Sequence, residues 1–106
     1  MSICGTSEYL APEMIKKIGY GPDVDWWCLG CLIYEMVMGY PPFEGTNRME
    51  LFENIVFKKP TFTGVTVILF QMSEVLADLL QKLLTKDPTK RLGHGNVEAI
   101  KKHPWF

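Results

Sequence analysis

The stretch Asp23–Met38 constrains the fold more than any other part of this chain. After its first residues it is apolar on every side, and inside it only Asp25 and Glu35 carry a charge. A helix that is apolar all round is a buried helix. Gly39 is a typical helix stop, and Pro41-Pro42 prevents the helix from continuing. The rest of the chain is therefore expected to pack around one central helix.

Two shorter helices are predicted on either side of that stretch. Ala11–Ile15 can form one helical turn, because Pro12 is tolerated in a first turn. Asn47 followed by Glu50 resembles a capping box, which opens a helix that continues through Ile55.

An amphipathic helix is predicted after Ser73, which is placed to cap it. Its leucines recur at i, i+3, i+4, i+7 and i+8, the spacing of one helix face: Leu76, Leu79, Leu80, Leu83 and Leu84. Asp87-Pro88 ends this helix. Asn96 is placed to cap a last short helix that ends at His103-Pro104. The fold class predicted from these patterns is all-α.

Composition excludes several classes of function. The chain has 106 residues and a net charge of −1, and its Lys and Arg residues are scattered, so nucleic acid is not an expected partner. The apolar stretch Trp26–Tyr34 is too short to cross a bilayer, and no membrane partner is expected. No secretory signal is visible at Met1–Thr6. The expected location is cytoplasmic or nuclear.

The three cysteines invite a metal or redox hypothesis. Cys28 and Cys31 form a Cys-x-x-Cys pair, but a structural zinc site needs two further ligands, and His94 and His103 stand alone. The pair also lies inside an apolar run rather than at a helix start. We interpret Cys28 and Cys31 as buried free thiols in a reducing compartment, and we expect no metal site.

Three charged residues have more than one interpretation. Asp25 at the head of a buried helix would be costly without hydrogen-bond donors, yet it could also cap its own helix. Glu13 and Arg91 could each be ordinary surface charges. Composition and periodicity leave these alternatives open.

Several motifs together resemble one family. Gly5–Glu13 resembles the end of a protein-kinase activation segment, including its Ala-Pro-Glu tripeptide. Asp25–Gly30 resembles the Asp-x-Trp-x-x-Gly motif of the central buried helix of kinases. Further motifs follow in the family's order: Pro41-Pro42-Phe43, Asp87–Gly93 and His103–Phe106. The segments Cys4–Thr6 and Arg91–Gly93 are similar to the AGC group, the kinases related to cyclic-AMP-dependent kinase. The resemblance covers nearly the whole chain.

The resemblance implies structural roles for six residues. It pairs Glu13 with Arg91 in a buried ion pair that ties the activation segment to the far end of the lobe. It makes Asp25 an acceptor for backbone hydrogen bonds from the catalytic loop. Thr6 matches the threonine that supports the catalytic Asp and Lys of that loop. Trp27 and Gly30 belong to the same structural set.

The resemblance also implies substrate contacts and a modification site. Ile3, Ser7 and Leu10 match the pocket for the residue after the phosphoacceptor, although this group usually has Pro where Ser7 stands. Glu8 and Glu35 match acidic positions that attract substrate Arg, and a carboxylate is the expected partner for a guanidinium. The alternative for Glu35 is a helix-end charge that reaches solvent. Ser2 matches the activating phosphorylation site of AGC kinases.

The catalytic parts of a kinase are not found in this sequence. There is no His-Arg-Asp, no Asp-Phe-Gly and no glycine cluster after a strand. Residues 1–106 are therefore expected to be a partial kinase domain, running from the end of the activation segment to the domain C-terminus. The N-terminal lobe, the catalytic loop and the metal-binding motif are expected to be missing, either because the sequence is a fragment or because the gene product is truncated.

The implied function is that of a helical C-terminal lobe fragment of a serine/threonine kinase, an ATP-dependent phosphotransferase for protein Ser/Thr. Its substrates are expected to carry basic residues before the phosphoacceptor. ATP and Mg belong to the full-length family member, and this chain is expected to bind neither and to be inactive alone. The alternative is a non-catalytic interaction module derived from a kinase lobe, using the peptide groove and the helix that begins near Asn47.

One segment departs from the family pattern. Thr63–Met72 looks too long and too apolar for the short loop that kinases have there. Within it, Val65–Phe70 is uncharged, free of proline and β-prone, which is the profile of an aggregation-prone segment. It is interpreted either as an insertion that packs on the lobe or as translated non-coding sequence.

Overall fold

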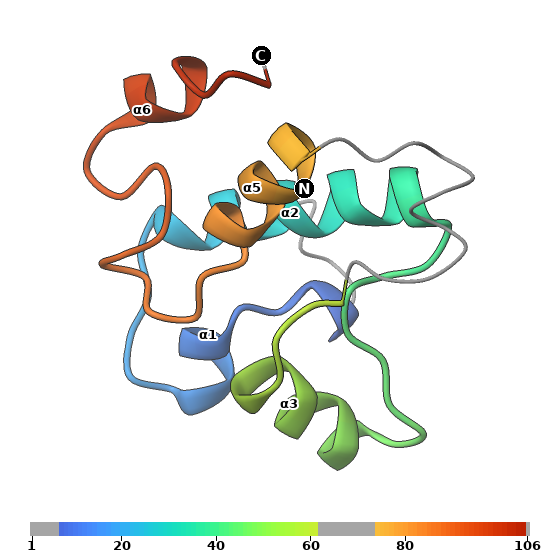
Figure 1. Cartoon of the computed structure of the whole chain (residues 1–106). Coiled ribbons are helices and arrows are strands. Elements are labelled where there is room, and N and C mark those ends of the chain that lie inside the picture. Colours follow the sequence, from blue (N-terminus) through green and yellow to red (C-terminus); the bar gives the residue numbers. More distant parts are fainter. Residues whose placement is uncertain (1–6, 62–73, 106) are drawn as a thin grey trace.

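The computed structural model describes residues 7–61 and 74–105. Within these ranges every regular element is a helix, which confirms the predicted mainly α fold (Figure 1). The elements are a 3-10 helix η1 (Ser7–Tyr9) and α-helices α1 (Pro12–Lys16), α2 (Asp23–Met38), α3 (Arg48–Phe57), α5 (Glu74–Leu83) and α6 (Val97–Lys101). The predictions for Val65–Phe70 and for the Ser73 cap concern residues outside the described ranges.

Helix α2 is the centre of the molecule, as its all-round apolar sequence predicts. In Figure 1 it runs across the middle, α5 lies against it, and α1 and α3 lie together to one side. Trp27 is fully buried in the core, and Gly39 ends the helix with a positive φ of 85°. At that backbone angle glycine is the favoured residue, because a side chain would be strained there.

The contact between α2 and α5 depends on a glycine facing a leucine row. The predicted leucine face is confirmed, because the four leucines of α5 and the one that directly follows it are buried: Leu76, Leu79, Leu80, Leu83 and Leu84. A Cβ built on Gly30 would lie 2.9 Å from Leu83 Cβ and 3.0 Å from Leu84 Cδ2. Gly30 therefore lets the two helices approach more closely than any other residue would.

The start of α3 confirms the predicted cap. The Asn47 side-chain oxygen accepts a hydrogen bond of 2.9 Å from the Glu50 backbone N–H. The Glu50 carboxylate in turn accepts from Thr46, at 3.3 Å from its backbone nitrogen and at 3.0 Å from its hydroxyl. The bond from the Glu50 amide satisfies one of the N–H groups that a helix start otherwise leaves unpaired.

The end of the chain is held by a buried histidine rather than by the cap expected at Asn96. Asn96 occupies the N-cap position of α6, but its side chain makes no capping hydrogen bond. His103 is buried, and its Nδ1 accepts from the Trp105 backbone N–H at 3.1 Å. Its Nε2 lies 2.8 Å from Asp78 Oδ2, which ties the segment after α6 to α5. The bond from His103 and that from Lys82 lower the pKa of Asp78.

The cysteines differ from the expectation at one position. Cys31 is a buried free thiol, and burial raises its pKa. Cys28, however, is disulfide-bonded, so the prediction of a free thiol there is wrong. Cys28 is also buried. The count and spacing of cysteines cannot reveal which sulfur atoms the fold brings together.

No helix in the described parts of the chain is both long and apolar enough to cross a membrane.

Candidate functional site

The first part of the site is an ion pair between Glu13 and Arg91. Pro12 opens α1 and places Glu13 in its first turn, while Arg91 follows the loop after α5. Arg91 Nη1 donates to Glu13 Oε2 at 2.7 Å, and Nη2 donates to Oε1 at 2.9 Å. The Arg91 side chain is 0% exposed and the Glu13 side chain is 2% exposed. The predicted buried salt bridge is confirmed, and the surface-charge alternative for these two residues is excluded.

The remaining donors of Arg91 bind backbone carbonyls from two other segments. Nε donates to Thr85 O at 2.8 Å, Nη1 also donates to Asp23 O at 2.9 Å, and Nη2 to Lys86 O at 3.3 Å. A buried charge is stable only when its hydrogen-bonding groups are satisfied. Arg91 thus joins α1, the head of α2 and the loop after α5 in a single cluster.

Aromatic rings and a second cation lie beside this ion pair. The rings of Trp27 and Phe43 stack, with centroids 5.7 Å apart and planes 9° from parallel. The Arg91 guanidinium lies 5.0 Å from the Trp27 ring centroid, and Lys86 Nζ lies 4.3 Å from that of Phe43. These are distances at which a cation is attracted by an aromatic face.

Lys86 is the most perturbed cation of the cluster. Its ammonium donates to the Ile55 carbonyl at 2.5 Å, which connects the loop after α5 to α3. Burial lowers the pKa of Lys86 to about 8, and repulsion from Arg91 and Lys16 acts in the same direction. Sequence reasoning missed this residue, because only the packed neighbours distinguish it from the other lysines.

Asp25 lies in the first turn of α2 and is exposed. The N-cap position belongs to Pro22, and no side chain caps this helix, so the hypothesis that Asp25 caps its own helix is not supported. Within the described residues no hydrogen bond reaches the Asp25 carboxylate. This carboxylate is therefore accessible from outside the chain.

Tyr9 brings the two predicted acidic docking residues into one environment. Tyr9 is 8% exposed and follows Glu8 in η1, while Glu35 lies in the last turn of α2. The pKa of Tyr9 is raised to about 12, and burial is the largest cause. The charge of Glu35 and a hydrogen bond to Glu35 raise it further, and the charge of Glu8 makes a smaller contribution. Both carboxylates therefore act on the same phenol.

Glu8 also lines a pocket that sequence reasoning did not anticipate. This cavity of about 430 Å³ is lined by Glu8, Glu44, Gly45, Thr46 and Glu50. Three of these five residues carry carboxylates, and none is cationic. The capping motif at Asn47 was a signal for Glu50, but nothing in the sequence placed Glu50 and Glu44 beside Glu8.

The other predicted contact residues are only partly described. Leu10 follows η1 and is half-buried, and Ser7 is the first residue of η1. Ser2, Ile3 and Thr6 lie outside the described residues. Their predicted roles in phosphorylation, in substrate contact and in support of a catalytic loop remain predictions.

Among the described residues, no group of three or more His, Cys, Asp or Glu side chains is placed to hold a metal ion. The acidic pocket would repel a polyphosphate, because its charged groups are all carboxylates.

Comparison with known proteins agrees with the fold and the motifs. The Protein kinase domain family matches residues 1–106. The chain is 41% identical over 109 residues to protein kinase C epsilon type of Rattus norvegicus, covering 99% of this chain and 14% of the relative. It is 42% identical over 107 residues to cAMP-dependent protein kinase catalytic subunit 3 of Drosophila melanogaster, covering 99% and 17%. For serine/threonine-protein kinase OXI1 of Arabidopsis thaliana the identity is 47% over 105 residues, covering 99% and 23%.

The chain belongs to the protein kinase domain family. Its relatives are serine/threonine kinases that include members of the AGC group, such as the cyclic-AMP-dependent enzyme. The chain spans less than a quarter of the length of these three relatives, from 14% to 23%. Protein kinases of this family use ATP and Mg.

Proposed function

We propose that this chain is the substrate-docking and supporting part of a serine/threonine kinase lobe, whose full-length form transfers the ATP γ-phosphate to protein Ser/Thr. The preferred substrates carry Arg before the phosphoacceptor. The observation that carries this proposal is the acidic pocket beside η1, where Glu44 and Glu50 join Glu8. Glu35 acts on the neighbouring Tyr9.

The chemistry of this surface suits a basic peptide. An Arg side chain can donate two parallel hydrogen bonds to one carboxylate, and charge-assisted bonds are stronger than neutral ones. Glu8 and Glu35 are half-buried, so solvent and salt screen them less than fully exposed groups. The half-buried Leu10 offers an apolar contact for the residue that follows the phosphoacceptor.

Support for the catalytic loop is the second part of the proposal. Asp25 presents an accessible carboxylate at the head of α2, the most buried helix. Because that helix is held rigidly in the core, the carboxylate is positioned to accept hydrogen bonds from backbone N–H groups of the catalytic loop. The Glu13–Arg91 pair fixes α1, and with it the end of the activation segment, against the loop after α5. Thr6, which precedes η1 in the sequence, supports the catalytic Asp and Lys of the catalytic loop. Ser2 is the activating phosphorylation site.

This chain alone is proposed to be inactive, because residues 1–106 form only part of a kinase domain. Phosphoryl transfer requires a catalytic Asp, a metal-binding Asp-Phe-Gly and a phosphate-binding Lys, and none of these motifs occurs in the sequence. Binding of a basic peptide is expected to be weak, because this chain supplies only one side of the peptide-docking surface. The missing N-terminal kinase portion is the partner that would complete it.

Peptide binding tests the docking proposal. A fluorescent peptide with two Arg residues before Ser is titrated with the chain at low and high salt. Glu8→Gln and Glu35→Gln are each expected to weaken binding about three- to tenfold, and salt should reduce the wild-type affinity. Glu98→Gln, on the distant helix α6, is the matched control. Equal binding of a peptide in which Glu replaces both Arg residues would refute the basic preference.

A kinase assay tests the proposed inactivity. The purified chain is incubated with Mg-ATP and the same peptide, and nucleotide binding is followed by calorimetry. We expect neither phosphate transfer nor tight nucleotide binding. Phosphate transfer that Thr6→Ala abolishes would contradict the proposal, because a contaminating kinase would not respond to that substitution.

A further inference from the structure

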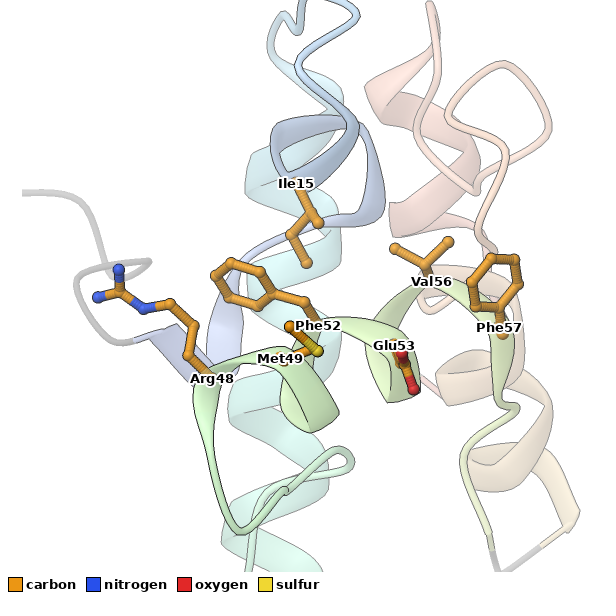
Figure 2. Close-up of a pocket in the computed structure, with 7 residues that line it drawn as sticks. All are labelled: Ile15, Arg48, Met49, Phe52, Glu53, Val56 and Phe57. Carbon is orange, nitrogen blue, oxygen red and sulfur yellow. The ribbon is translucent and has the colours of Figure 1, made fainter.

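An exposed apolar groove follows one face of α3 and shares no lining residue with the acidic pocket. It encloses about 560 Å³, and Figure 2 shows its lining: Ile15, Arg48, Met49, Phe52, Glu53, Val56 and Phe57. Ile15 comes from α1 and points toward Phe52, whereas the other six belong to α3. Met49 is 74% exposed and Phe57 is 79% exposed. Such contiguous apolar surface on a soluble protein marks an interaction site.

The groove carries two charges of opposite sign. Arg48 and Glu53 are its only charged lining residues, and both are exposed. Neither forms a salt bridge within the described parts of the chain, although the Arg48 guanidinium lies 6.0 Å from the Phe52 ring centroid. Both charges are therefore available to a partner that offers the opposite sign at matching spacing.

We propose that the occupant of this groove is the same face of a second copy of the chain. In a dimer with two-fold symmetry the two α3 helices lie antiparallel, and each contact occurs twice. With the axis between Glu50 and Leu51, Arg48 of each copy faces Glu53 of the other. The same register places Met49 opposite Phe52. In this register residues 48–53 of one α3 pair with the same residues of the other, so the Arg48–Glu53 and Met49–Phe52 contacts are each made twice. Val56 and Phe57 lie beyond this paired stretch.

The size of the groove sets the expected affinity. A standard interface uses about 20–30 residues a side, whereas seven residues line this groove. The dimer is therefore expected to be weak, with a dissociation constant on the order of 10–100 µM. Because two ion pairs lie at the edge of the contact, its affinity should fall as salt rises.

Sedimentation velocity of the 106-residue chain between about 5 and 500 µM tests this proposal. Wild type should change from monomer to dimer with concentration. Arg48→Glu and Glu53→Arg should each raise the dissociation constant at least about tenfold, because each places like charges opposite one another twice. The double variant Arg48→Glu/Glu53→Arg restores both pairs with reversed polarity, and it should dimerise as wild type does.

Two further variants separate the groove from general stickiness. Met49→Ser removes an exposed groove side chain and should weaken the dimer. Val97→Ser, which removes an apolar side chain 48% exposed on α6, should not. Far-UV circular dichroism checks that every variant keeps its helices. Failure of the double variant to restore dimerisation, a monomer at all concentrations, or growth beyond a dimer would each overturn the proposal.

Discussion

Glu13 and Arg91 lie 78 positions apart in the sequence, yet their side chains form two hydrogen bonds of 2.7 and 2.9 Å in the protein interior. Arg91 also donates to the carbonyls of Thr85, Asp23 and Lys86. The contact is therefore the centre of a network, and removal of either partner affects three segments of the chain.

Glu13→Gln is expected to lower the free energy of unfolding by about 3–5 kcal/mol, because it leaves the Arg91 guanidinium buried without a counter-charge. Urea denaturation followed by circular dichroism measures the change. Glu98→Gln breaks an exposed pair with Lys101 and should change stability by less than about 1 kcal/mol. Equal effects of the two substitutions would show that the buried pair is not a structural clamp.

Lys86→Met is expected to alter how stability depends on pH. The folded-state pKa of Lys86 is lowered from 10.5 to about 8, so the unfolded state binds more protons between these values. Lys86 therefore destabilises the fold below pH 8, and that cost disappears as pH rises toward 10.5. Between these limits wild type should gain about 1–2 kcal/mol relative to Lys86→Met, after allowance for solvent screening.

The comparison between wild type and Lys86→Met is needed because Cys31 acts in the opposite direction. Burial raises the pKa of the Cys31 thiol from 9.0, so its titration lowers stability as pH rises above that value. Burial, the largest cause of the Cys31 shift, is common to both proteins, so most of this contribution cancels in their difference, although the Lys86 charge itself lowers the Cys31 pKa. Parallel stability curves for the two proteins from about pH 7 to 10 would contradict the environment of Lys86 described above.

Gly30→Ala should destabilise the chain by about 1–3 kcal/mol, although alanine favours helix more than glycine does. The added methyl group would meet Leu83 Cβ at 2.9 Å and push α5 away from α2. Gly21→Ala is the control, because no heavy atom lies within 4 Å of its built Cβ. Thermal unfolding of both variants checks the prediction, and a stabilised Gly30→Ala would show that the helix contact has room to spare.

Asn47→Ala should cost about 1 kcal/mol, because it removes the acceptor for the Glu50 amide at the start of α3. Asn96→Ala changes the same residue type at the same helix position of α6, where the side chain makes no capping bond. It should have little effect. Urea unfolding curves for both variants measure the difference, and equal losses of stability would mean that the Asn47 bond does not stabilise α3.

Local patterns in the sequence are sufficient to predict most of the helices. The buried α2, the leucine face of α5 and the Asn47 cap follow from spacing within one element, because a helix places residues three and four apart on one face. The pairing of Glu13 with Arg91 is implied by the resemblance to kinases and not by any local pattern. The order of the motifs indicates the kinase family.

Other features depend on which segments the fold brings together. The meeting of Glu8 with Glu44 and Glu50 and the lowered pKa of Lys86 both involve contacts between distant parts of the chain. Asn96 shows the reverse case, since a suitable cap residue is present but its bond is not made. Periodicity and capping are properties of neighbouring residues, so the sequence alone determined the elements and their buried faces. Proximity, burial and charge at the site arise only when those faces pack, and the tertiary structure decided them.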